Sequence, residues 1–442
     1  MYRKATMALA VAAALGLPHA ATAQTQDELR TLREQVRQLD KRVQDAETTA
    51  RQAAVQASSR PASESAMNPA VSVILNGIYS NLSQDPSAFR INGFTPTLGE
   101  VGPGVRGFSL GESELALAAN IDHNFRGTLI ASISPEDSIG VEEGYIQTLS
   151  LSYGFTVKAG RFFSGVGYQN QIHAHAWDFT DAPLANKVFL GNQLNEDGVQ
   201  LKWVAPTDTY FDVGVEVGRG RQFPAAAGPA GPRNKNGVGS SNFFAHVGGD
   251  LGTGVAWQTG VSYLSTSPQD RTFENLDSSG TPVNTNSFTG NSRLWVLDGI
   301  LKWAPNYNPT YTNFKLQGEY FRRRENGDLT FDTATTGGFA SQQSGWYLQG
   351  VYQFVPMWRV GYRYDRLDSG TTSFSTPLTA ADFPILAAYN PTRHTVMVDW
   401  SPSEFSRIRL QAASDKSRSD ATDHQVFLQY IVSLGAHGAH KF

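Results

Sequence analysis

The chain has 442 residues, no cysteine and a formal net charge of −4. The lack of cysteine excludes a disulfide framework, thiolate metal sites and cysteine nucleophiles. Because there is no clustered excess of basic residues, nucleic acid is not an expected partner.

The first 23 residues show the three regions of a secretory signal peptide. The basic start MYRK precedes an apolar core over 5–17, and the triplet Ala-Thr-Ala at 21–23 has the small-x-small pattern of a cleavage site. The apolar core of about 13 residues is too short to span a bilayer as a helix. We therefore expect residues 1–23 to be a signal peptide, and the mature, exported chain to begin at Gln24.

Residues 24–55 carry a heptad pattern. Their apolar positions, from Leu29 to Ala53, follow a strict 3-4 spacing, which is the a/d seam of an α-helical coiled coil. A lone amphipathic helix is the alternative, but an isolated helix of this length is marginal in water, so the pattern favours self-association. Dimer and trimer both remain open. Residues 56–70 are rich in Ser, Ala and Pro and indicate a flexible linker.

From residue 71 onward the side-chain period changes to two. Trp295, Leu297 and Trp303, for example, alternate with Asp298 and Lys302, which is the pattern of a strand with one apolar and one polar face. The pattern predicts an all-β domain over 71–442, a 16-stranded antiparallel transmembrane β-barrel. The predicted strands are 71–82, 108–123, 125–135, 141–153, 155–165, 196–205, 209–221, 241–252, 254–266, 292–304, 312–324, 344–355, 358–368, 393–401, 405–416 and 423–435.

The connections between these strands alternate in length. Short turns, such as those at Asn124, Gly154 and 401–404, alternate with long segments. Short turns on one side and long loops on the other are typical of an outer-membrane barrel. A soluble β-sandwich is the alternative, but it requires neither this asymmetry nor so long a run of strands. The long loops are predicted at 83–107, 166–195, 222–240, 267–291, 325–343 and 369–392.

A family resemblance rests on the ends and on the whole pattern. The last alternating strand and the terminal Phe442 resemble the assembly signal of Gram-negative barrels. Coiled coil, linker and 16 strands together resemble the trimeric Gram-negative porins with a periplasmic helical extension, which include phosphate-selective and sugar porins. The stretch 160–163 (GRFF) is similar to part of a phosphate-porin motif, without its Lys-Pro-Phe portion. The resemblance implies a homotrimer embedded in outer-membrane lipid, with the coiled coil in the periplasm.

The same resemblance implies a porin, that is, passive diffusion of small hydrophilic solutes or ions through a water-filled pore. In such porins the third extracellular loop, here about residues 166–195, folds into the lumen and narrows it. The alternative is that the side chains of this loop merely pack it against the barrel wall. The residues expected to form the constriction are His173, His175, Trp177, Asp178 and Asp181.

Charged residues on the polar face of the strands are candidates for the pore lining. Acidic and basic groups balance, which predicts no strong ion preference overall. Arginines on strands 358–368 and 405–416 and acids on strand 108–123 are expected to face each other across the pore. The pore-lining candidates are Glu112, Glu114, Asp122, Lys158, Lys202, Asp298, Lys315, Glu319, Arg359, Arg363, Arg407 and Arg409.

Two short-spaced histidine pairs, His173-x-His175 and His437-x-x-His440, suggest a second function. Neutral imidazoles are good zinc ligands, so a channel or receptor for a divalent metal such as zinc is the alternative, with Zn²⁺ as solute and no resident cofactor. Solvent-exposed histidines without a ligand are the simpler interpretation. Each pair needs a further ligand, and the candidates are Asp178, Asp181 and His424.

Two other classes of barrel protein are not expected. We expect no G-x-S-x-G nucleophile elbow, no H-E-x-x-H helix and no P-loop. Histidine–aspartate pairs alone are too common to indicate catalysis, so we expect no enzymatic activity. Energy-coupled receptors use 22 strands and a plug domain inside the lumen. This chain has room for neither.

Overall fold

The structure is a computed structural model. The chain divides into two units, 1–65 and 66–442, and all residues that the structure describes belong to the second. The predicted signal peptide, the coiled coil and nearly all of the linker lie outside the described residues, as do His437, His440 and Phe442. Among the described residues, no helix is both long and apolar enough to cross a membrane. The described residues are 69–97, 101–135, 138–227, 236–277, 280–305 and 308–435.

Antiparallel strands make up most of this part of the chain. Each alternates larger apolar residues with polar or small ones, a pattern that suits a sheet whose two faces meet different surroundings. The strands are β1 (Ala70–Leu82), β2 (Gly107–Leu110), β3 (Ser113–Asn120), β4 (Phe125–Ile133), β5 (Ile139–Thr148), β6 (Phe155–Phe163), β7 (Asn195–Val204), β8 (Tyr210–Gly218), β9 (Ser240–Leu251), β10 (Val255–Thr266), β11 (Arg271–Leu276), β12 (Pro282–Trp303), β13 (Asn313–Phe331), β14 (Thr335–Val355), β15 (Trp358–Phe374), β16 (Thr392–Ser403), β17 (Ser406–Lys416) and β18 (Asp423–Gly435).

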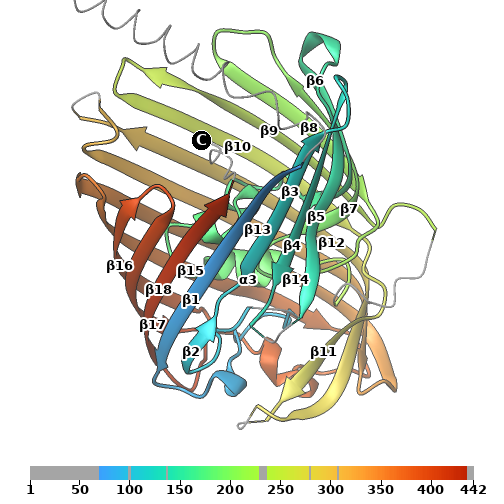
Figure 1. The fold of residues 1–442 in the computed structure, drawn as a ribbon. Coiled ribbons are helices and arrows are strands. Elements are labelled where there is room, and N and C mark those ends of the chain that lie inside the picture. The colour runs from blue at the N-terminus through green and yellow to red at the C-terminus, as the bar shows by residue number, and fades with distance from the viewer. Residues whose placement is uncertain are drawn as a thin grey trace, which may run out of the picture. The chain divides into compact units, whose positions relative to one another are not determined.

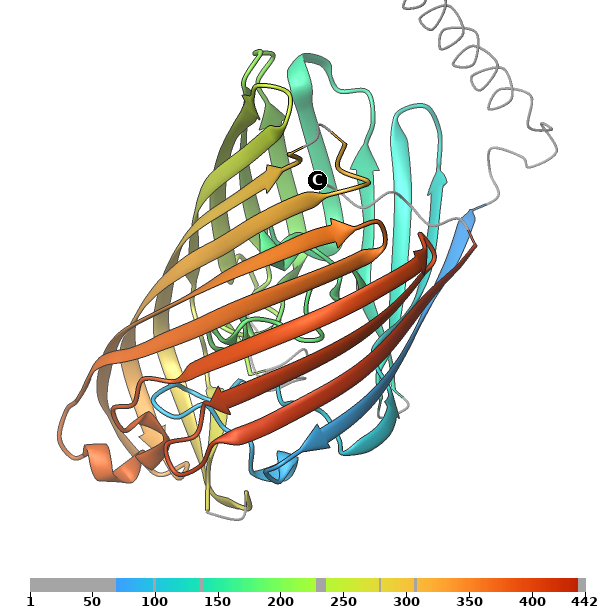
Figure 2. The ribbon, with the colours of Figure 1, turned by 90° about the vertical axis from the view of Figure 1, so that its left-hand side faces the viewer.

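The strands close into a barrel, because β18 pairs antiparallel with β1 along almost its whole length (Figures 1 and 2). The 18 described segments occupy 16 positions around the ring. First, β2 and β3 both pair with β1 and so share one position. Gly111 lies between these two segments, and its amide donates to the Asn76 carbonyl at 2.8 Å. Second, β10 and β11 both pair with β12. The predicted 16-stranded antiparallel barrel is confirmed.

The two faces of the barrel wall differ in chemistry. On β12 the outward side chains Trp295 and Leu297 are 52% and 54% exposed, whereas the inward Val296 and Asp298 are buried. The same alternation runs along the other strands, so large apolar side chains cover the outside and most inward ones are polar. A closed barrel pairs all of its strand backbone groups with neighbouring strands, and its apolar outer surface contacts lipid. It therefore meets both requirements for a protein that spans a bilayer.

Four strands are longer than the sequence predicts. Strands β12 to β15 run into the segments predicted as loops, and most of 325–343 is a hairpin with a three-residue turn. These segments are rich in Thr, Asn and Gly, which predicts loops. However, Phe288, Leu329 and Phe383 belong to one buried apolar cluster that joins the strand extensions to the last long loop. This burial stabilises strands that the local sequence does not favour.

The outward face gives a direct test of membrane insertion. Replacing Leu297 by arginine places a charge in the middle of the apolar surface, and we expect a loss of about 2–4 kcal/mol in folding into lipid. The same change at Val283, exposed on the outer extension of β12, should cost about 0–1 kcal/mol. Folding yield in liposomes, read from the heat-modifiable shift on electrophoresis, measures both. Equal yields for the two variants would contradict the assignment of the lipid face.

Candidate functional site

Residues 164–194, named here the inner loop, connect β6 to β7 through the inside of the barrel (Figures 1 and 2). The Leu184 amide donates to the inward-facing Asp365 carboxylate at 2.9 Å, and the inward-facing Arg323 donates to the Val188 carbonyl at 3.2 Å. The loop predicted at 166–195 therefore lies in the lumen, as the family resemblance implies.

Helix α3 (Leu184–Leu190) anchors the inner loop to the wall. It begins after Pro183 and ends at Gly191, whose φ of 64° is the left-handed conformation that terminates helices. All seven side chains of the helix are buried, and it contacts β13, β14 and β15. The Phe189 ring stacks on the Phe321 ring with centroids 5.7 Å apart. Apolar packing thus holds one end of the loop.

Ion pairs hold the middle of the inner loop. Asp178 pairs with Lys315 and, at 3.1 Å, with Arg359. Asp181 lies 3.1 Å from Arg363 and also pairs with Lys187 and Arg393. We name the cations around these two carboxylates the basic cluster: Lys187, Lys315, Arg359, Arg363, Arg393, Arg407 and Arg409.

The cations of this cluster keep both aspartates ionised. Burial by itself would raise the pKa of each carboxyl, but the charges of Lys315 and Arg359 hold the pKa of Asp178 well below its ordinary value. The charges of Arg393 and other cations do the same for the pKa of Asp181. Both aspartates therefore remain counter-charges for the barrel wall throughout the physiological pH range.

Trp177 directly precedes Asp178 in the inner loop and is almost fully buried. Its indole nitrogen donates to the Ile172 carbonyl at 2.7 Å. Its own carbonyl accepts from Arg409 at 2.7 Å and from Arg407 at 3.2 Å. Trp177 thus fastens the inner loop to β17 through its backbone, as the alternative interpretation of the loop residues expects.

The two predicted histidines of the inner loop lie against carboxylates of β3 and β5. His173 Nε2 lies 3.1 Å from Glu143, and its Nδ1 lies 3.3 Å from Glu142 and 3.5 Å from Glu114. His175 Nδ1 lies 2.7 Å from the other oxygen of Glu114. We name these five residues the acidic cluster. All three glutamates are more than nine-tenths buried.

The carboxylates also change the protonation of His173. Burial by itself would lower the pKa of this imidazole. The neighbouring carboxylates, Glu142 and Glu143 foremost, outweigh burial and raise the pKa of His173 well above its ordinary value. In the absence of another cation, His173 therefore carries a positive charge that partly balances the three glutamates.

The sequence reasoning missed Glu142 and Glu143. In a regular strand two successive side chains point to opposite faces, so only one of them would face inward. Here the pairing of β4 with β5 jumps from Ile130 opposite Glu143 to Ala131 opposite Val141. The extra residue is a β-bulge, which turns both glutamates towards the inner loop. Two adjacent acids within an otherwise alternating strand are the only sequence signal of this feature.

The strand order corrects the expected arrangement of charge. In the ring, only β18 and β1 separate the arginine-bearing β17 from β3 with its Glu114. Acidic and basic groups therefore lie on adjoining parts of the wall and not across the full pore. The inner loop contacts both, since Asp178 follows His175 by only three positions, a span of roughly 11 Å at most.

Most of the predicted pore-lining residues face inward, but not all reach open space. Arg363, Arg409, Asp298 and Glu319 are each at least 95% buried, and the inner loop contacts Arg363, Arg409 and Glu319. Asp122 does not line the lumen, because it is exposed in the short turn after β3, where it accepts from two turn amides. The remaining inward or half-buried candidates are Glu112, Glu114, Lys158, Lys202, Lys315, Arg359 and Arg407.

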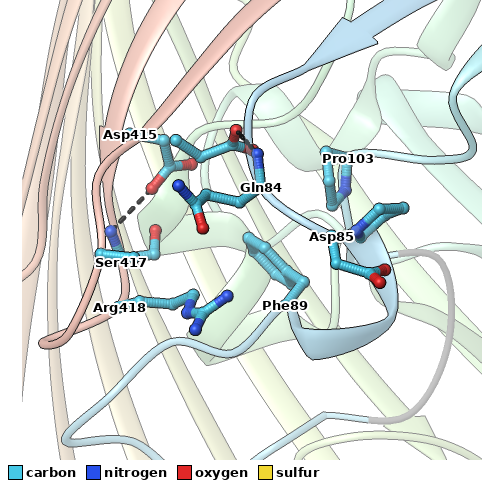
Figure 3. Close-up of a pocket in the computed structure, with 10 residues that line it drawn as sticks. Gln84, Asp85, Phe89, Pro103, Asp415, Ser417 and Arg418 are labelled. Atoms are coloured by element: carbon cyan, nitrogen blue, oxygen red, sulfur yellow. Dashed lines mark hydrogen bonds between the residues drawn. The ribbon is translucent and has the colours of Figure 1, made fainter. Parts of the chain in front are cut away.

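Two hollows differ greatly in size. One, of about 700 Å³, lies near the turn between β9 and β10 and is lined by Lys302, Lys315 and Arg359. The other lies among the long loops, where Phe89 and Gln84 approach the chain after β17 (Figure 3). Its volume of about 10 Å³ has room for about one water molecule. The first hollow, named here the basic hollow, is large enough for a small solute, and these three cations outnumber Asp250, the acid in its lining.

The expectation that the chain has no G-x-S-x-G stretch is wrong, because Gly-Phe-Ser-Leu-Gly at 107–111 has the letters of a nucleophile elbow. In that motif the serine lies on a tight turn from a strand into a helix. Here Ser109 lies within β2 and pairs with Ile78 of β1. The stretch is therefore part of the barrel wall.

Comparison with known proteins gives one clear relative. No family model matches the chain. Over 355 residues the chain is 33% identical to an uncharacterized protein of Aquifex aeolicus (strain VF5), which covers 76% of this chain and 70% of the relative. The chain belongs to the same family as this Aquifex protein.

The fold of this family member also has a counterpart among solved structures. The loop L8 deletion mutant of OmpT, an outer membrane protein of Vibrio cholerae, superimposes with a TM-score of 0.51 over 83% of this chain and 99% of that chain, at 10% identity. At this low identity the likeness concerns the fold alone, and it supports the closed barrel.

Proposed function

We propose that the protein is a porin of the outer membrane, through which small hydrophilic solutes or ions diffuse passively. The observation that carries the proposal is the closed ring of 16 strands with an apolar outside and a mostly polar inside. Barrels of this size enclose an aqueous channel when no plug domain fills them. The inner loop narrows the lumen, and the basic hollow of about 700 Å³ beside Lys315 remains open.

The proposed channel discriminates weakly between cations and anions. The basic cluster encloses Asp178 and Asp181, and the acidic cluster lies close by on the adjoining wall. Fields of opposite sign therefore overlap near the inner loop and largely cancel for an ion in the pore. The basic hollow favours anions locally, on one side of the barrel only.

The proposed assembly is a homotrimer in outer-membrane lipid, with the predicted coiled coil over 24–55 in the periplasm, as in sugar and phosphate porins with a helical extension. A shallow apolar groove on the outer face of β3 to β6 supports a protein neighbour, since Gly144, Ala159 and Gly160 leave room for close approach. Beside it Arg161 and Asp197 pair at 2.6 Å on the same outer face. Charged groups are costly against lipid and are better matched by another subunit.

Solute flux into liposomes tests the proposed function. Liposomes that contain the refolded full chain should swell in isotonic solutions of small neutral sugars, and the rate should fall steeply with sugar size because the inner loop limits the bore. Protein-free liposomes and a large oligosaccharide serve as controls. Liposomes that contain folded barrel but do not swell in any sugar would refute diffusion through the lumen.

A further inference from the structure

We propose that the acidic cluster is a divalent metal site, in which Glu114, His173 and His175, with Glu142 as a further ligand, bind Zn²⁺ or a similar borderline cation. The ion would join the inner loop, which carries both histidines, to β3 and β5, which carry the glutamates. Mixed imidazole and carboxylate ligands select zinc, copper, nickel or cobalt over calcium or magnesium.

The ligand atoms already lie close enough together to converge on such an ion. One donor atom from each of Glu114, His173 and His175 lies within 4.8 Å of the other two. In a tetrahedral zinc site with bonds of about 2.0–2.1 Å, neighbouring ligand atoms are about 3.3 Å apart. His173 Nδ1 lies 3.5 Å from Glu114 Oε2 and 3.3 Å from Glu142 Oε2. Small side-chain rotations therefore suffice to surround an ion.

Two buried atoms of the cluster have room in their bonding for a cation. Glu142 Oε2 and His173 Nδ1 lie 3.3 Å apart as an ion pair, but neither atom has a hydrogen bond of good geometry, although the Glu142 residue is only 7% exposed. A buried polar atom with no hydrogen bond is costly. A cation between these two atoms would satisfy both.

The charge of the cluster favours a divalent ion. Three carboxylates lie together with two imidazoles, and Lys158 on β6 is the nearby permanent cation. With neutral imidazoles, as metal ligands require, the three carboxylates leave an excess of negative charge that a divalent cation offsets. Glu143, which approaches the other nitrogen of His173 at 3.1 Å, then orients that ring from outside the metal.

The site differs from the metal chemistry expected from the sequence. Asp178 and Asp181, the expected further ligands, pair with cations of the basic cluster, and the exposed His424 lies on β18. The completing ligands are Glu114 and Glu142. Because these ligands are buried and come from three separate segments, the ion stays bound and holds the inner loop to the barrel wall. A transported solute, by contrast, must bind weakly enough to leave.

Zinc titration of the full-length refolded barrel, first stripped with chelator, tests the site. His437 and His440 are replaced by glutamine in every sample so that they cannot contribute ligands. We expect one Zn²⁺ per chain by calorimetry. H175Q or H173Q should abolish binding, and E142Q should weaken it about 10- to 100-fold, an effect comparable with loss of an orienting group. H424Q is the matched control and should bind as the parent does.

A second measurement does not require that the histidine or glutamate variants fold. With Cu²⁺ bound to the unmodified cluster, electron paramagnetic resonance should show hyperfine splitting from two imidazole nitrogens. No binding at one equivalent, binding that survives H173Q and H175Q, or a copper spectrum without nitrogen splitting would each overturn the site.

The consequence for the channel rests on the proposed function. In planar bilayers, Zn²⁺ should reduce current fluctuations that arise from movement of the inner loop, and H175Q should remove this effect. A barrel that binds zinc but never conducts would overturn the porin function and leave the metal site intact. A barrel that conducts but binds no zinc would overturn the metal site alone.

Discussion

Replacing Asp181 by asparagine should free the middle of the inner loop and raise the conductance of the channel. The Asp181 carboxylate lies 3.1 Å from both Lys187 and Arg363 and also pairs with Arg393. All three cations are at least 97% buried. Removing one partner of a buried ion pair costs about 3–5 kcal/mol, because the other charge stays buried without compensation.

The effect of the Asp181 change can be measured in two ways. Single-channel recordings should show a larger and noisier conductance, and limited proteolysis should cut within the inner loop of the variant but not of the parent. Asp332, exposed in the turn between β13 and β14, provides the matched control, and D332N should leave both readouts unchanged. If D181N conducts like the parent and resists the protease, the ion pairs do not hold the loop.

Replacing Glu325 by glutamine should destabilise the barrel more than any exposed charge change. Glu325 accepts two hydrogen bonds from Arg271, at 2.7 and 3.1 Å, and lies 3.8 Å from Arg323. All three side chains are at least 99% buried. The Arg271 guanidinium also lies between two rings, 4.8 Å from Phe223 and 4.9 Å from Phe288. Loss of the shared carboxylate leaves two arginines uncompensated, at a cost of about 3–5 kcal/mol.

Reversible unfolding of the refolded barrel by guanidinium in detergent or lipid, followed by tryptophan fluorescence, measures this loss. The matched control is D420N, which removes an exposed carboxylate that pairs with Arg90 and Arg418. Exposed pairs contribute about 0–1 kcal/mol, so the control should unfold close to the parent. Equal free energies of unfolding for E325Q and D420N would show that the buried ion pair contributes no more than a surface pair.

The barrel itself was predictable from the sequence because lipid outside and polar groups inside impose opposite demands on successive residues. The predicted strand 209–221 corresponds to β8 (Tyr210–Gly218), and 155–165 corresponds to β6 (Phe155–Phe163). The ends of the strands were less predictable. Beyond the apolar belt both faces of β12 to β15 meet polar or loop surroundings, so the strand extensions lack the clear alternation that identified the rest.

The site was only partly predictable. The five inner-loop residues from His173 to Asp181 do lie inside the barrel, because a long connection between strands has its own composition and length. The residues that they pair with could not be predicted, since Asp181 and its partner Arg393 are 212 positions apart in the sequence. The paired glutamates at 142 and 143 depend on a single bulge, which the local sequence does not specify.

Single-channel recording of the full chain in planar bilayers tests the central claim most directly. An open water-filled lumen predicts stepwise rises in current as barrels insert, a linear current–voltage relation, and a conductance that grows in proportion to KCl concentration. The reversal potential in a salt gradient should lie close to zero, because groups of both signs face the lumen. Folded, inserted barrels that give no current steps would contradict a continuous aqueous path and with it the assignment as a porin.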